Sequence, residues 1–179
     1  MADYKHFYVQ QQTYDGTNFT GVGDVVDTYD RFKVVCQELP FKYIPETKDL
    51  PQRDWYDEDG VDVYFPIDGI KFKAYDIEVK FLYVGKETDM AADIKEFVDF
   101  MTGRTNIVSG ATTSGTKNVS LIFFDEYTST GKRGAYVSSI SDELFYYTDK
   151  SIDAICLFSL NMKIIDPVYE VSFINGVLA

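Results

Sequence analysis

The feature that most constrains the fold of this chain is a run of strict alternation near its C-terminus, AICLFSLNMKI, from Ala154 to Ile164. One face of the run is apolar and the other carries polar side chains: Ala154, Cys156, Phe158, Leu160, Met162 and Ile164 against Ser159, Asn161 and Lys163. Successive side chains of a β-strand point to opposite faces, so this pattern predicts a long strand with one face in the core and one mixed face. Pro167 has no backbone N–H to donate, and we therefore expect regular pairing to end near Asp166.

A second alternating run, YDIEVKFLY from Tyr75 to Tyr83, predicts another half-buried strand, with its odd-numbered residues in the core. A helix is predicted shortly after it, because apolar residues recur at spacings of three and four over residues 91–101. These residues are Ala91, Ile94, Phe97, Val98 and Met101. Thr88 or Asp89 is expected to cap the start of the helix, and Gly103 to end it.

The remaining segments complete an order of hairpin, long strand, helix, hairpin and long strand. VDVYFPI is strand-like, and NVSLIFFDEYT and GAYVSSIS are typical of hairpin partners. Residues 106–118 are rich in Gly, Ser and Thr and are expected to form a mobile loop. Five or more strands with one helix predict an α+β, mostly β fold: a two-layer β-sandwich or barrel with the helix between or against the sheets.

The length of 179 residues suits a single domain, residues 1–179, that buries a core of its own. Within it we expect an irregular N-terminal arm over residues 1–53, a core over residues 54–167 and a C-terminal extension over residues 168–179. The end of the expected arm, FKYIPETKDLPQRDW, is broken up by prolines and is predicted to run as an extended connection over the surface.

The net charge of −12 argues against a groove that grips phosphates, because nucleic-acid binders carry clusters of Lys and Arg. It is expected to keep an aromatic-rich protein soluble, and an acidic channel wall would also let DNA pass without holding it. The N-terminus has no apolar stretch typical of a signal peptide, and no membrane span is predicted. Cys36 and Cys156 fit a reducing compartment, with one disulfide as the alternative.

Two segments that look like ligand-binding loops do not have the residue spacing that such loops require. Aligning Gly60 with the glycine of a calcium-binding loop puts Trp55 and Pro66 where carboxylates are required. We expect a solvated acidic turn from Asp57 to Asp62, with an irregular cation site built from Asp57, Asp59 and Asp62 as the alternative. GATTSGTKN has Thr116 where a phosphate-binding loop needs its lysine, so no such loop is predicted.

The sequence also lacks a recognisable catalytic arrangement. His6 is the single histidine available as a general base, and it lies in the expected arm. The carboxylate pairs Asp125–Glu126 and Asp142–Glu143 are neighbours of the kind expected by chance among 29 acidic residues. We therefore predict no enzyme, and no catalytic, cofactor-binding or metal-binding residues.

The order of short motifs from Asp59 to Pro167 resembles a known family. DGVDVYFPIDG, YDIEVKFLYVG, DIKEFVDFMTGR, SLIFFDEY and AICLFSLNMKIIDP follow one another in the manner of the tail-tube fold of bacteriophages. The chain is most similar to the N-terminal ring domain of siphophage distal tail, or baseplate hub, proteins. The shared features are an early DG turn, a helix with an F-x-x-F stripe at Phe97 and Phe100, and a late strand leading to Asp166–Pro167. A second, C-terminal domain typical of distal tail proteins does not follow in this sequence.

The resemblance implies a homo-hexameric ring in a virion tail, assembled in the bacterial cytoplasm and stacked on adjacent tail or baseplate proteins. DNA or a tape-measure protein would pass through its channel without tight binding, and no cofactor is implied. A ring repeats one heterologous interface until it closes. The expected arm would be ordered by lying across a neighbouring subunit, and the loop from Gly103 to Asn118 would contact the next ring.

Two groups of residues are predicted to form the interface or ring wall. The first comes from the mixed face and end of the last long strand: Ser159, Asn161, Lys163, Asp166, Pro167, Val168 and Tyr169. The second consists of tyrosines in the expected arm, whose rings give contact area at low entropic cost: Tyr4, Tyr8 and Tyr14. Tyr146 and Tyr147 are further candidates for such a platform. The alternative function, from a different class, is a β-sandwich adhesion or glycan-binding module.

Overall fold

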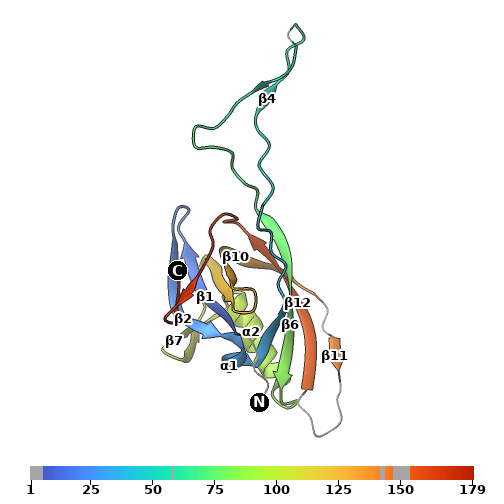
Figure 1. Ribbon diagram of the computed structural model, residues 1–179. Helices are drawn as coiled ribbons and strands as arrows, with labels where there is room; N and C mark the ends of the chain where they lie inside the picture. Colours follow the sequence, from blue (N-terminus) through green and yellow to red (C-terminus); the bar gives the residue numbers. More distant parts are fainter. Residues whose placement is uncertain (1–5, 58, 142–143, 147–153) are drawn as a thin grey trace.

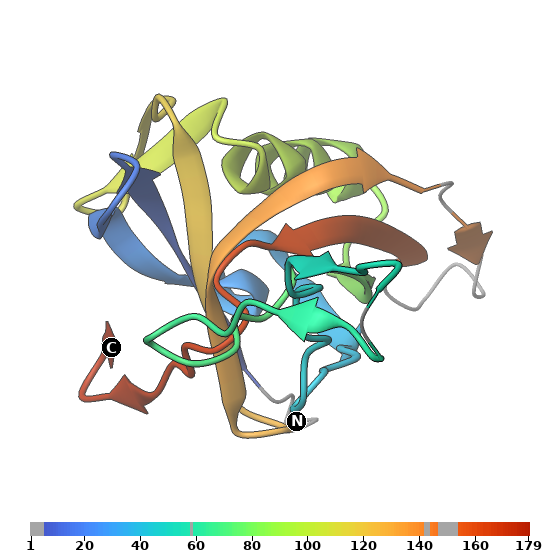
Figure 2. The same ribbon diagram turned by 90° about the horizontal axis from the view of Figure 1, so that it is seen from above.

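The computed structural model describes residues 6–57, 59–141, 144–146 and 154–179, with the backbone alone for residues 144–146 and 154. Its main sheet is built from eight strands: β1 (Phe7–Tyr14), β2 (Phe19–Asp27), β3 (Val34–Glu38), β6 (Tyr75–Gly85), β9 (Val119–Asp125), β10 (Thr130–Ile140), β11 (Leu144–Tyr146) and β12 (Ala154–Ile164). Their order is β2-β1-β9-β10-β12-β6-β3, with β11 also pairing with β12, and all pairs are antiparallel. The sheet curls around the longer helix in the manner of a two-layer sandwich (Figure 2). The predicted α+β, mostly β fold is confirmed.

The two alternating runs pair with each other along their whole length. β12 and β6 form an antiparallel ladder of eleven residue pairs, from Ala154 opposite Gly85 to Ile164 opposite Tyr75. Residues directly opposite share a face, so the apolar face of one strand continues that of the other. Described residues of the predicted core face are buried on both strands, Phe158 and Phe81 among them. Both strand predictions are confirmed.

The longer helix, α2 (Met90–Met101), packs its apolar side on this core face. Phe97 lies edge-on to Phe81 and Phe158, with ring centroids 5.1 and 5.9 Å apart. The buried stripe includes Phe100, while Ala91 is exposed at the first turn. The expected cap is only partly formed: Asp89 holds the N-cap position, but its side chain makes no bond to the helix backbone.

Gly103 follows α2 with a φ of +75°, as expected for the residue that ends a helix. A side chain there would also meet Val119, because a Cβ atom would lie 2.3 Å from its Cγ1. Neither described helix, α2 or the five-residue α1 (Thr28–Phe32), has the length and apolarity needed to span a bilayer.

Residues 7–38 belong to the folded body, where the sequence suggested an irregular arm. β1 lies between β2 and β9, and Phe7 and Val9 are buried in the main core. The alternation of apolar and polar residues in β1 is hard to recognise in the sequence, because the inward-facing residue after Phe7 and Val9 is Gln11. Its side-chain amide is buried and donates to the carbonyls of Phe100 and Thr105, at 2.6 and 2.7 Å. A polar side chain whose amide nitrogen donates two hydrogen bonds thus occupies a core position.

The segment that does project is residues 40–74, which we call the arm. Figure 1 shows it rising from one end of the body as a long, narrow loop. Its regular pairing is limited to β4 (Gln52–Arg53) with β5 (Asp62–Val63) and a single bridge between Thr47 and Phe72. The strand expected over VDVYFPI is therefore reduced to two residues. Prolines supply no N–H to a ladder, which limits pairing along this segment.

Two small hairpins complete the described chain. β7 (Thr105–Val108) pairs with β8 (Ala111–Ser114), where a mobile loop was expected, so that prediction is wrong. β13 (Phe173–Ile174) pairs with β14 (Val177–Leu178) at the C-terminus. The C-terminal segment covers the outer face of β1 and β9 through a second, smaller cluster of apolar residues: Ile122, Val171 and Leu178, with Tyr8, Val25, Phe124 and Phe173 packed against them.

Candidate interaction surfaces

The arm carries an unusual concentration of exposed apolar side chains. It holds nine of the nineteen large apolar residues that are exposed in the described chain: Tyr43, Ile44, Trp55, Tyr56, Val61, Tyr64, Phe65, Ile67 and Ile70. Tyr56 is 100% exposed and Ile67 98%. Single exposed apolar residues are normal, whereas exposed apolar side chains gathered on one segment are typical of interaction sites.

The tip of the arm is nevertheless ordered by its own side chains. The Arg53 guanidinium stacks 3.6 Å from the centre of the Trp55 ring, and Trp55 Nε1 donates to Asp62 Oδ2 at 3.1 Å. These contacts bridge β4 and β5 and fix the ends of the tip loop. A binding segment that is already ordered loses less conformational entropy when it docks.

The acidic turn at the tip does not assemble a ligand set among the residues described. In that part of the chain, no group of three or more His, Cys, Asp or Glu side chains lies close enough to hold a metal ion. Asp62 instead accepts the indole hydrogen bond, and Glu58 lies outside the described residues. The structure thus gives no support to the cation-site alternative from Asp57, Asp59 and Asp62.

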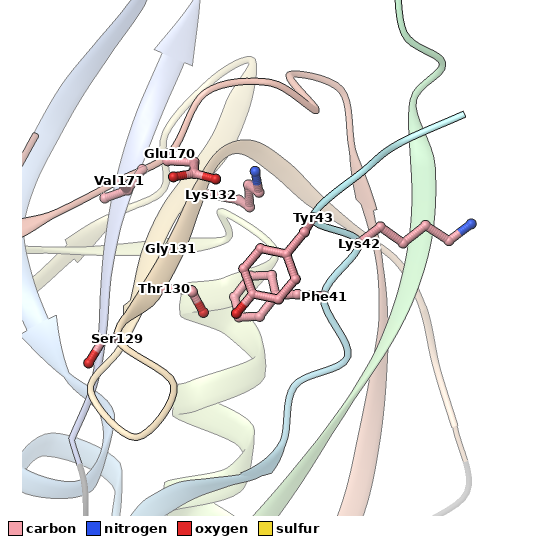
Figure 3. A pocket seen from close by; sticks show the side chains of 9 residues that line it. All are labelled: Phe41, Lys42, Tyr43, Ser129, Thr130, Gly131, Lys132, Glu170 and Val171. Atoms are coloured by element: carbon pink, nitrogen blue, oxygen red, sulfur yellow. The ribbon is translucent and has the colours of Figure 1, made fainter. Parts of the chain in front are cut away.

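The base of the arm is fixed to the body beside a small pocket, shown in Figure 3. The pocket is lined by Phe41, Lys42, Tyr43, Ser129, Thr130, Gly131, Lys132, Glu170 and Val171. Phe41 stacks on the core residue Phe123 with centroids 6.5 Å apart, which ties the arm to the core. Lys132 is only 5% exposed, and its Nζ donates to the carbonyl of Pro167 at 3.2 Å. The stacking of Phe41 on Phe123 therefore holds the base of the arm against the core.

Three residues of the first predicted interface group, Ser159, Asn161 and Lys163, lie on the outer face of β12. Ser159 is buried, because Ser141 packs over it and exchanges hydrogen bonds with its backbone at 3.1 and 3.2 Å. Asn161 and Lys163 are half-buried, and Asn161 donates to Ser139 at 2.9 Å. Of these three, Asn161 and Lys163 are accessible to a partner.

Charges of both signs surround these two residues on the outer face of β6 and β12. Lys163 lies opposite Asp76, Asn161 opposite Glu78 and Ser159 opposite Lys80. Lys80 Nζ donates to Glu38 on β3 at 2.6 Å, and this bond raises the pKa of the Lys80 ammonium. The face thus combines three carboxylates with two ammonium groups and has a small acidic excess.

The second part of the predicted interface gathers around an arginine that the sequence did not single out. Arg133 Nε donates to Asp166 at 2.7 Å, and its guanidinium lies 3.5 Å from the centre of the Tyr169 ring. On its other side Arg133 lies 5.3 Å from the ring of Phe19, which stacks on Tyr14 at 4.6 Å. The structure therefore brings Tyr14, Asp166 and Tyr169 into one partly exposed ladder.

The other predicted interface residues have different environments. Pro167 is buried, whereas Val168 is exposed. Tyr8 stacks on Phe173 at 3.9 Å beneath the C-terminal hairpin, and burial there raises the pKa of its hydroxyl. Tyr4 and Tyr147 lie outside the described residues, and Tyr146 is described only by its backbone.

Of the carboxylate pairs considered for catalysis, Asp125 and Glu126 lie in the described chain, and both accept hydrogen bonds that hold the local structure. Asp125 accepts hydrogen bonds from the backbone and hydroxyl of Thr128, at 3.0 and 2.8 Å, and so closes the turn between β9 and β10. Glu126 accepts from the backbone N–H of His6 at 3.1 Å. Asp142 and Glu143 lie outside the described residues.

A shallow apolar groove runs along the outward side of α2. It is lined by Met90, Ala91, Ile94, Lys95, Val98, Asp99, Arg104 and Ile140. Lys95 Nζ lies 2.5 Å from Asp99 Oδ2, and Arg104 Nη1 lies 3.5 Å from Asp99 Oδ1. The hydrogen bond from Lys95 is the largest of the effects that lower the pKa of the Asp99 carboxyl. The two cations lie at an exposed rim and share one partly buried carboxylate.

No protein-family model matches the chain, and no curated protein matches it in sequence. Among solved structures, the chain is similar to the SPP1 Dit protein (gp 19.1), described as a paradigm of the hub adsorption apparatus in phages that infect Gram-positive bacteria. The TM-score is 0.46 and the identity 15%, over 92% of this chain and 52% of that one. The similarity is a weak one of fold, and the chain covers about half the length of that protein. It assigns no role to any residue here.

Proposed function

We propose that this chain is a structural, ring-forming protein of a phage-type tail, at the distal tail or baseplate hub or in the tail tube. Copies of the chain assemble, six to a ring, around a channel that DNA or a tape-measure protein passes through. The observation that carries the proposal is the arm, whose apolar side chains are exposed on a segment with almost no core of its own. The order of elements, with one long helix packed against a curled sheet, is the basis of the resemblance to tail-ring proteins.

The arm supplies a driving force for assembly. Burying one large apolar side chain contributes roughly 1.5–3 kcal/mol. Covering Tyr56, Ile67 and Ile44 alone would contribute roughly 4–9 kcal/mol before the cost of association. In the proposed ring the arm of one copy meets the body of the next, so the contact is heterologous. A heterologous contact repeated around an axis closes into a ring or continues as a filament.

The outer face of β6 and β12 is suited to a channel wall. Its three carboxylates and two ammonium groups give it little attraction for a polyanion, and the whole chain carries a net charge of −12. Tight binding to DNA needs several cations placed along the phosphate backbone. Asn161 and Lys163 would lie on this wall or at the seam between neighbouring sheets.

The proposal is tested by the mass of the protein in solution, with negative-stain imaging of the same sample. The wild-type chain should form annular particles of about six copies. Replacing Tyr56 and Ile67 together by serine should give a folded 20.5 kDa monomer. Tyr127→Ser is the matched control, because Tyr127 is also well exposed (78%) but lies on the body. A wild-type monomer at high concentration, or normal rings from the double variant, would contradict the proposal.

One observation favours a second candidate, a glycan-binding module. The Tyr14 and Tyr169 rings are partly exposed in the ladder around Arg133, and such rings stack well on sugar faces. This function predicts a monomer with saccharide affinity that is lost in Tyr169→Ala. A glycan array with the wild-type and variant proteins separates the two candidates.

A further inference from the structure

We infer that the groove along α2 is the docking site for the arm tip of a second copy of this chain. The inference rests on the proposed function for the premise that copies assemble, and it goes further by naming the two surfaces that meet. Each subunit then donates one arm tip and receives another.

The groove has the composition of a site for an aromatic side chain. Its floor is formed by methionine and aliphatic side chains from the first turns of α2, with Ile140 from the end of β10. Ala91 is exposed and small, and it leaves room in the groove at the first turn of α2. Thioether sulfur makes favourable contacts with aromatic rings, and the Met90 side chain is partly exposed beside this opening. A flat ring can therefore cover apolar area that water now contacts.

The arm tip presents a ring of this kind. Tyr56 is fully exposed, and the stacked pair of Arg53 and Trp55 holds the backbone directly before it. Tyrosine is among the residues that most often dominate the energy of an interface. Its hydroxyl can stay at the wet rim while the ring lies in the groove.

The charges of the two surfaces are complementary. The carboxylates of Asp54, Asp57 and Asp59 flank Tyr56, and none of the three has an ion-pair partner among the described residues. The groove places Lys95 and Arg104 at its rim, against the single carboxylate of Asp99 that they share. An acidic tip is thus attracted to a rim with an excess of positive charge, which guides docking and fixes its orientation.

The geometry excludes docking of the tip on its own subunit. Figure 1 shows the arm rising away from α2, and the stacking of Phe41 on the core residue Phe123 holds the base of the arm in place. The tip lies nine residues beyond the bridge at Thr47, which is roughly 30 Å of extended chain. A body of this size has a radius of gyration of about 15 Å, so the tip reaches well across a neighbouring subunit.

Disulfide trapping between separately labelled copies tests the contact. Tyr56→Cys and Ala91→Cys proteins are purified apart, mixed and oxidised. The mixture should form a disulfide-linked dimer at least about tenfold faster than a mixture of Ile67→Cys with Ala91→Cys. Ile67 is the matched control because it is equally exposed on the arm but lies away from the tip. Equal rates in the two mixtures would overturn the inference.

A charge exchange supplies an independent measurement that does not depend on oxidation. Arg104→Glu should raise the dissociation constant for assembly about tenfold, and adding Asp57→Arg should restore it. If the wild type forms rings but neither cross-linking nor rescue is seen, the groove is not the receptor and the proposed function stands. If the wild type remains a monomer, both the proposed function and this inference fail.

Discussion

Replacing Phe158 by alanine tests whether the even-numbered face of β12 forms the core. The side chain is 2% exposed, and its ring lies 5.8 Å from that of Phe81 and 5.9 Å from that of Phe97. Phe81 is held by the sheet and Phe97 by α2, so neither can move far into the space left behind. A Phe→Ala change at such a site costs about 3–5 kcal/mol of unfolding free energy. For a chain of this size the midpoint of thermal unfolding should fall by roughly 6–20 °C.

The measurement is urea unfolding followed by circular dichroism, with an unchanged slope taken as the sign that only stability has changed. Tyr64→Ala is the matched control, because Tyr64 is an aromatic residue of the arm and largely exposed. Its unfolding free energy should stay within about 0.5 kcal/mol of the wild type when measured under conditions that keep the protein monomeric. A loss below about 1 kcal/mol for Phe158→Ala would refute the assignment of this face to the core. An equal loss for Tyr64→Ala would refute the view that the arm is unpacked in the monomer.

Three further predictions concern single residues. The lowered pKa of Asp99 means that its ionised form stabilises the fold above the ordinary aspartate range, and that this contribution is lost as the pH falls through the lowered value. Asp99→Asn should therefore be less stable than the wild type at neutral pH, with urea midpoints that converge below about pH 4; parallel curves would contradict this. Gly103→Ala should cost about 2 kcal/mol or more in the same assay, because alanine is strained at positive φ and its Cβ would overlap Val119; an unchanged midpoint would refute the strain argument. Lys163→Glu should change stability by less than about 1 kcal/mol, with like charges placed opposite Asp76, but weaken assembly measured by light scattering; unchanged assembly would count against an outer-face interface.

The parts of the fold that could be predicted from sequence are those with a local period. The alternation of apolar and polar residues predicts β6 and β12, and the spacing of apolar residues by three and four predicts α2. Ala91 is exposed although it belongs to the predicted stripe, because periodicity gives a face but not how far the opposing sheet extends. Pairing of β6 with β12 also fits their sequences. Each strand has one apolar face, and neighbouring strands join these faces into one continuous apolar surface.

Local pattern failed where a polar side chain forms hydrogen bonds or stacking contacts with groups that are distant in the sequence. Gln11 breaks the alternation of β1, yet its amide hydrogen bonds at the far end of α2 make it a core residue. Arg133 was missed for the same reason. Its partners Asp166, Tyr169 and Phe19 come from three separate segments, and only the folded sheet brings them together.

The arm shows a different kind of failure, and it is the more informative one. VDVYFPI has the composition of a strand, but composition cannot say whether a partner strand or a core lies within the same chain. Here the pairing is limited to β4 with β5, and Tyr64, Phe65 and Ile67 stay exposed in the described chain. The tip is nevertheless held in shape by Arg53, Trp55 and Asp62. A segment that only connected the body strands would need neither the exposed apolar side chains nor the ordered tip. Local rules that are broken without compensation among the described residues point to compensation from another molecule, in line with the proposed assembly of copies through the arm.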